Sequence, residues 1–161
     1  MSFESRLRLD IGGLLLVAAI LLVSCGSETQ KVEATPQMSA ILTNAFHLNV
    51  PKTFNFDDCV AYQYSSMDGP TKVYLGRFTG INSSASNLLQ ELELRKITTS
   101  RLPPAKYTGP DSKYRWWRPD AYGECDGFFA ESEEQKSMAL FGYLCQDSTN
   151  CILFLKIRQH Q

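Results

Sequence analysis

The stretch GFFAESEEQKSMALFGYLCQDSTNCILFLKIR, residues 127–158, decides the fold of this chain. It contains three runs rich in aromatic and aliphatic residues, Gly127–Glu131, Ser137–Cys145 and Cys151–Arg158, which the polar segments SEEQK and QDSTN separate. Short apolar runs bounded by turn-forming residues are typical of neighbouring antiparallel strands. The stretch therefore predicts an antiparallel meander of three strands.

A further pair of strands precedes the meander. The segments Cys59–Ser66 and Thr71–Thr79 are rich in Val, Tyr and Phe, and the sequence MDGP between them has the composition of a tight turn. We expect these two segments to form a β-hairpin.

One helix is predicted before the hairpin, from Pro36 to about Phe46, with Thr35 as the N-cap and Pro36 at the first helical position. Its apolar residues recur at i, i+3, i+4, i+7 and i+8, which places them on one face of the helix. They are Met38, Ile41, Leu42, Ala45 and Phe46. This face is expected to pack against the core.

A second helix is predicted after the hairpin, from Ser83 to Ile97, with Glu91 and Arg95 spaced as an i,i+4 ion pair. Its apolar side consists of Ala85, Leu88, Leu89 and Leu92. The resulting order α-β-β-α-β-β-β lacks the alternation typical of parallel strands. We therefore expect an α+β fold with an antiparallel sheet of about five strands and two helices on one face.

The composition limits the chain to one ordinary domain. It has 161 residues, of which 43% are hydrophobic and 11% aromatic, enough for a single core. Sixteen Lys and Arg against 17 Asp and Glu give a net charge of -1, so the basic excess of a nucleic-acid-binding protein is missing. We expect one domain over residues 36–161 and no nucleic-acid partner.

The N-terminus has the layout of a secretory signal. Arg6 and Arg8 precede an apolar run, Ile11–Val23, which stops at Ser24-Cys25. A helix of that length spans about 20 Å, less than the roughly 30 Å hydrocarbon core of a membrane. We therefore expect residues 1–24 to be a signal peptide rather than a spanning helix.

The end of this leader, Leu22-Val23-Ser24-Cys25, resembles the lipobox of bacterial lipoproteins. The resemblance implies cleavage before Cys25 and lipidation of that cysteine by several acyl chains, since one chain gives only marginal membrane binding. Gly26 rather than Asp after the cysteine implies an outer-membrane location facing the periplasm. Residues 25–35 are then the lipidated cysteine and a flexible polar tether.

Four more cysteines, Cys59, Cys125, Cys145 and Cys151, predict disulfides in an exported domain. Cys145 and Cys151 flank the QDSTN turn of a predicted hairpin and are expected to pair, which leaves Cys59 for Cys125. The chain has no C-x2-C pair and no neighbouring histidines, so we expect neither a metal site nor redox catalysis.

The run Lys113-Tyr114-Arg115-Trp116-Trp117-Arg118-Pro119 holds both tryptophans of the chain. Neighbours in an extended segment point to opposite sides, so one tryptophan is expected in the core. The other, with Tyr114, would face outward and form a candidate binding surface for a sugar ring or a protein partner beside Arg115 and Arg118. Alternatively, both rings anchor a long loop on the sheet.

Residue constellations typical of enzymes are sparse. A glycosidase needs two carboxylates across a cleft, and the available ones are Asp57, Asp58, Asp111, Asp120, Glu124 and Asp126. The chain has no G-x-S-x-G, no H-E-x-x-H and no Gly-rich phosphate loop, and His47 and His160 are its only histidines. We therefore assign no catalytic residue and no cofactor.

The sequence favours a membrane-anchored envelope lipoprotein of non-catalytic binding or scaffolding type, with an envelope protein or a glycan as its partner. Two alternatives remain open. The first is a small periplasmic inhibitor of the kind that lysozyme inhibitors represent, which are also small, exported and disulfide-linked. The second is a cell-wall hydrolase.

Overall fold

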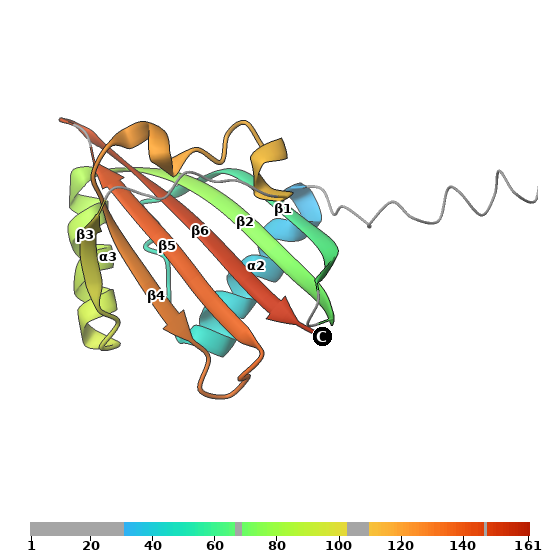
Figure 1. Ribbon diagram of the computed structural model, residues 1–161. Coiled ribbons are helices and arrows are strands. Elements are labelled where there is room, and N and C mark those ends of the chain that lie inside the picture. The colour runs from blue at the N-terminus through green and yellow to red at the C-terminus, as the bar shows by residue number, and fades with distance from the viewer. Residues whose placement is uncertain (1–30, 67–68, 103–109, 147) are drawn as a thin grey trace, which may run out of the picture.

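The fold is known for residues 31–66, 69–102, 110–146 and 148–161, which the computed structural model describes (Figure 1). The predicted signal peptide, Cys25 and the first half of the predicted tether lie outside these residues. Among the described residues, no helix combines the length and the apolar character needed to cross a membrane.

The described residues form a sheet of six antiparallel strands in the order β1-β2-β6-β5-β4-β3 (Figure 1). The predicted hairpin and meander are both confirmed, and β2 joins them by pairing with β6. The strands are β1 (Asn55–Ser66), β2 (Gly69–Ile81), β3 (Thr99–Leu102), β4 (Cys125–Glu131), β5 (Met138–Gln146) and β6 (Asn150–His160). The fold is α+β.

The prediction of about five strands is wrong by one, because β3 was missed. Its four residues, TSRL, are too few to show an alternating apolar pattern, and Thr99, Ser100 and Arg101 are exposed. Only pairing with β4 makes this segment a strand. β3 thus forms one edge of the sheet.

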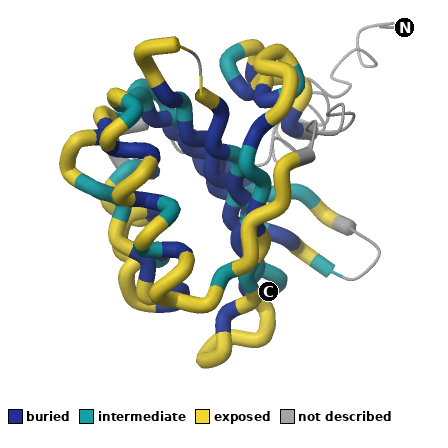
Figure 2. The backbone as a smooth tube through the Cα atoms, turned by 90° about the vertical axis from the view of Figure 1, so that its left-hand side faces the viewer, coloured by how far each residue is buried: buried dark blue, intermediate teal, exposed yellow. Residues whose placement is uncertain are grey.

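Two helices, α2 (Lys31–Phe46) and α3 (Asn82–Leu94), cover the same face of the sheet (Figures 1 and 2). We call this the helix face. α2 packs on β1 and β2, whereas α3 packs on β2, β5 and β6. The predicted apolar faces are confirmed, since Met38, Leu42, Leu88 and Leu92 are fully buried against the sheet. The predicted ion pair between Glu91 and Arg95 is also present, at 3.2 Å.

α2 begins five residues earlier than predicted. Lys31–Thr35, expected to be tether, is helical, so Thr35 is not the N-cap and Pro36 lies inside the helix. The prediction took Pro36 as the helix start because proline lacks a backbone donor and is best tolerated there. The added turn is held by tertiary packing, since Ala34 is fully buried in the core.

Both helices end on a residue in the left-handed conformation. His47 has φ 50° and Lys96 has φ 57°. In each case the next residue, Leu48 or Ile97, donates its N–H to a carbonyl of the last turn at 2.9 Å, the pattern that closes a helix C-terminus. The chain therefore reverses sharply after α3 and returns as β3.

Apolar side chains lie on both faces of the sheet. One core lies between the helices and the sheet and includes Phe78, Leu140, Leu153 and Leu155. A second core lies on the opposite face, called here the outer face, and includes Val60, Leu75 and Phe154 together with residues after β3. The sheet therefore needs cover on both sides.

The predicted disulfide pairings are wrong. The structure joins Cys125 of β4 to Cys145 of β5, whereas Cys59 and Cys151 are buried thiols outside this bond. Cys145 pairs in register with Ile152, one residue beyond Cys151, so Cys145 and Cys151 lie on opposite faces. Cys59 likewise lies on the helix face and Cys125 on the outer face. The sheet separates both predicted pairs.

We expect peptide mapping without reductant to recover Cys125 and Cys145 as one linked species. The two residues are 20 positions apart, and a loop of that size contributes about 3 kcal/mol in the chain-entropy model. Cys125→Ser should therefore lower the free energy of unfolding by about that amount. A linked peptide containing Cys145 and Cys151 would contradict the assignment.

Candidate functional site

The outer face is covered at one end by a segment that we call the strap, residues 110–122 (Figure 1). It consists of two short 3-10 helices, η1 (Pro110–Lys113) and η2 (Pro119–Tyr122), and the turn between them. Trp117 donates its N–H to the carbonyl of Tyr114 at 2.9 Å. The predicted binding surface is therefore built on tight turns and not on an extended chain.

Trp117 fastens the strap to the sheet. Its side chain is 1% exposed and contacts Phe154 of β6 edge to face, with ring centroids 5.5 Å apart. Tyr114 is also buried, 5.6 Å from the ring of Tyr62 on β1. The expectation that Tyr114 faces outward is wrong, because the turn directs it into the outer-face core, where its ring lies 5.9 Å from that of Trp116.

A buried carboxylate forms a polar anchor beneath the strap. Asp111 of η1 is 4% exposed. It accepts a hydrogen bond from the hydroxyl of Tyr62 and pairs with the ammonium of Lys156 on β6. A buried charge is tolerated when it is paired and hydrogen-bonded. Asp111 thus joins the strap to two strands that lie on either side of β2.

Tyr62 acts as a permanent donor to this carboxylate. Burial, followed by the hydrogen bond and the negative charge of Asp111, raises the pKa of the Tyr62 phenol well above its ordinary value. The hydroxyl therefore keeps its proton at neutral pH. Lys113 lies above this site, with its ammonium 5.1 Å from the Tyr62 ring and 4.7 Å from the Tyr114 ring.

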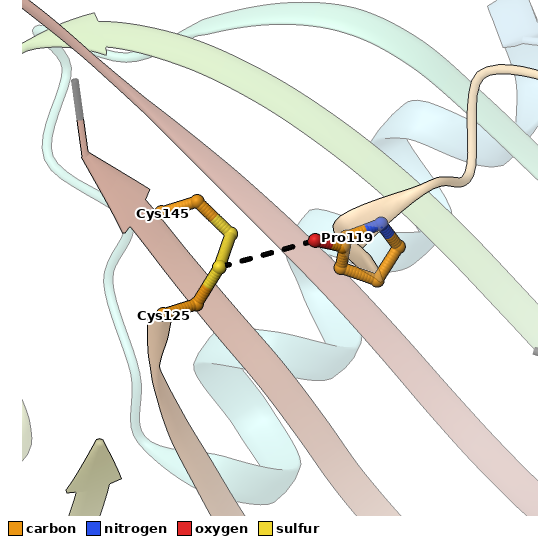
Figure 3. Close-up of a disulfide and its surroundings, with 3 residues drawn as sticks. All are labelled: Pro119, Cys125 and Cys145. Atoms are coloured by element: carbon orange, nitrogen blue, oxygen red, sulfur yellow. Dashed lines mark hydrogen bonds between the residues drawn. A yellow bond between two sulfur atoms is a disulfide. The ribbon is translucent and has the colours of Figure 1, made fainter. Parts of the chain in front are cut away.

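The disulfide supports the other end of the strap. Figure 3 shows the disulfide facing the carbonyl oxygen of Pro119, the first residue of η2. The Cys125 sulfur lies 4.0 Å from that oxygen. Both half-cystines belong to the same outer-face core as Trp117. The strap therefore rests on a cross-linked pair of strands.

The exposed part of the strap is smaller than the sequence predicted. Arg115 and Arg118 are exposed and Trp116 is half-buried. Arg118 binds Asp120 through two hydrogen bonds of 3.0 and 3.2 Å, and this carboxylate raises the pKa of the guanidinium. Among the described residues Arg115 has no ion pair. Arg115 and Trp116, with Lys113 beside them, remain as the candidate contact residues.

Tyr62, Asp111 and Lys156 are site residues whose role sequence reasoning missed. In the sequence, nothing distinguishes Asp111 from the other candidate carboxylates. Lys156, however, carried a signal, because it is the single charged residue within the apolar run CILFLKI. A lysine in a buried strand requires an acidic partner. The sequence around Lys156 does not identify which acidic residue that is.

The remaining carboxylates considered for catalysis are dispersed over the molecule. Asp57 and Asp58 lie 3.9 and 2.5 Å from the guanidinium of Arg77, and Glu124 lies 3.7 Å from that of Arg101. Within the ranges that the structure describes, no three His, Cys, Asp or Glu side chains gather as metal ligands would.

Comparisons with protein families, with curated proteins and with solved structures give no match. The site is therefore interpreted from its own geometry.

The two tryptophans are expected to differ in their effect on stability. Trp117→Ala removes a fully buried ring and should lower the free energy of unfolding by about 3 to 5 kcal/mol. Trp116→Ala removes a half-buried ring and should cost roughly 1 kcal/mol or less. Urea unfolding followed by circular dichroism measures both. Equal losses would show that Trp116 is as much a packing residue as Trp117.

Asp111→Ala is expected to destabilise the protein by about 3 kcal/mol, because it leaves the Lys156 ammonium and the Tyr62 hydroxyl without their acceptor. Glu124→Ala is the matched control, since it breaks a well-exposed ion pair with Arg101 and should cost less than about 1 kcal/mol. Similar unfolding midpoints for the two variants would contradict the assignment of Asp111 as the polar anchor.

Proposed function

We propose that this chain is a lipid-anchored, non-catalytic binding protein of the bacterial cell envelope and that the exposed edge of the strap binds cell-wall glycan. The observation that carries the proposal is the placement of Trp116 and Arg115 on a base fixed by Trp117 and Asp111. A contact surface held in place before binding loses little conformational entropy when its partner arrives.

The chemistry of this edge fits a glycan that carries acidic groups. The half-exposed ring of Trp116 offers an apolar face against which a sugar ring can stack. The guanidinium of Arg115 and the ammonium of Lys113 lie nearby in the chain and are positive at neutral pH. Cell-wall glycan combines sugar rings with the carboxylates of its peptide stems, and it is within reach of a tethered periplasmic domain.

The non-catalytic part of the proposal follows from the state of the carboxylates. Five of the six considered for catalysis are engaged with a cation, which is Arg77, Arg101, Arg118 or Lys156. A carboxylate held by a cation is a poor general acid, because the cation favours its ionised form. These groups therefore support structure rather than bond cleavage.

The anchor rests on the leader pattern. The short apolar run, the lipobox-like Leu22-Val23-Ser24-Cys25 and Gly26 after it support attachment through acyl chains on Cys25 to the outer membrane, facing the periplasm.

Binding is tested by co-sedimentation of the purified protein with insoluble peptidoglycan. Trp116→Ala and Arg115→Ala should each weaken binding by roughly thirtyfold if they are central contacts. Lys136→Ala removes an exposed positive charge from the β4–β5 turn and should leave binding unchanged. Release of soluble muropeptides would refute the non-catalytic assignment, and equal binding by all variants would refute the strap as the contact surface.

Lipidation is tested by metabolic labelling with a palmitate analogue. Cys25→Ala should abolish labelling and leave an unprocessed precursor, because no acceptor thiol remains at the cleavage site. Ser24→Gly is the matched control, because it keeps a small residue before the cysteine and should still be labelled. Labelling that persists in Cys25→Ala would rule out the anchor.

A further inference from the structure

A groove of about 830 Å³ lies between α3 and β3, away from the strap. One wall consists of Ser86, Leu89, Gln90 and Glu93, which recur at the spacing of a single helix face. β3 forms the opposite side through Thr99. Figure 2 views the molecule from this side, where α3 and β3 lie nearest the viewer. The groove thus runs between a helix and a strand at the edge of the sheet.

β3 leaves one row of backbone groups available at this edge. It is the terminal strand of the sheet, and among the described residues it pairs only with β4. The unpaired N–H and C=O groups of such a strand are a template for the addition of another extended chain.

The geometry of the disulfide shows which residues of β3 carry these groups. The Cα atoms of Cys125 and Cys145 are 4.4 Å apart, the separation of a non-hydrogen-bonded pair in an antiparallel ladder. Cys125 therefore directs its N–H and C=O away from β5 and toward its partner on β3, Leu102. Because these directions alternate along a strand, Thr99 and Arg101 direct theirs to the open edge.

The groove also carries acidic groups and an apolar strip. Glu93 and Asp126 line it, and among the described residues neither carboxylate has an ion pair. Among the lining residues Lys96 contributes one positive charge, which leaves them a net charge of one negative unit. Arg101, which pairs in register with Asp126, has Glu124 as its ion-pair partner at 3.7 Å. Leu89 and Ile97 are half-buried and present the apolar surface.

We propose that this groove binds an extended peptide that adds to β3 as a further strand. Thr99 and Arg101 supply the backbone hydrogen bonds. Side chains of a strand alternate between its two faces, so every second residue of the peptide faces α3. There a basic residue meets Glu93 and Asp126, and an apolar residue meets Leu89. The site takes basic, extended peptides and is separate from the strap.

The probe is the hexapeptide acetyl-Lys-Thr-Val-Thr-Lys-Thr-amide, titrated into the purified, isotope-labelled full chain and followed by nuclear magnetic resonance. Shifts should concentrate at the amides of Thr99 and Arg101 and at the methyl groups of Leu89. Asp126→Asn and Glu93→Gln should each weaken binding about fivefold, the limit for an exposed charge pair. The control Asp58→Asn, on β1 at the opposite edge of the sheet, should leave binding unchanged.

Changes to the peptide test strand addition without any change to the protein. Replacing both lysines by glutamate should weaken binding by at least about tenfold, because like charges then face each other. Two further peptides are N-methylated, one at the odd-numbered and one at the even-numbered residues. Only one of them should lose affinity, since only one set of peptide N–H groups faces β3. Equal binding by the two N-methylated peptides, shifts confined to other surfaces, unchanged affinity in Asp126→Asn, or no binding at millimolar peptide would each overturn the proposal.

Discussion

The structure depends on the burial of a sheet that is apolar on both faces. The two helices cover only one of these faces, and the outer face carries Val60, Leu75 and Phe154, which are buried as well. The strap provides the missing cover by placing Trp117 on Phe154. A loop that lies on an apolar surface loses conformational entropy, and the buried contact between Asp111 and Lys156 holds it there. The Trp117 contact and this charged pair together secure the second core.

The elements of the fold were largely predictable from the sequence, whereas their register was not. Apolar runs and turn residues identified the hairpin, the meander and both helices, because local composition carries that information. The cysteine pairing depends on which face each residue occupies, and a shift of one position exchanges the faces. Cys151 lies one position out of register with Cys145. Spacing in the sequence could not reveal this difference, and the four residues of β3 were too few to form a pattern.

The sequence predicted one feature of the candidate site, the burial of one of the two tryptophans, although the physical reason behind that prediction is wrong. The expectation that one tryptophan is buried rested on an extended chain, and the strap is instead a series of turns. A turn also separates neighbouring side chains, so Trp117 is fully buried and Trp116 only half-buried. The same turn directs Tyr114 into the outer-face core that contains Trp117. The Asp111 anchor joins residues 45 and 49 positions apart in the chain. Only the tertiary fold brings them together.

The same anchoring decides which strap residues are available to a partner. Trp117, Tyr114 and Asp111 are engaged with the sheet, and Arg118 is neutralised by Asp120. Arg115 and Trp116 are left on a loop that lost its conformational freedom on folding. Binding there therefore costs little further conformational entropy. The groove beside α3 differs, because it uses the backbone of an edge strand that, within the described part of the chain, pairs only with β4. Because the two surfaces use different segments, occupation of one does not require rearrangement of the other.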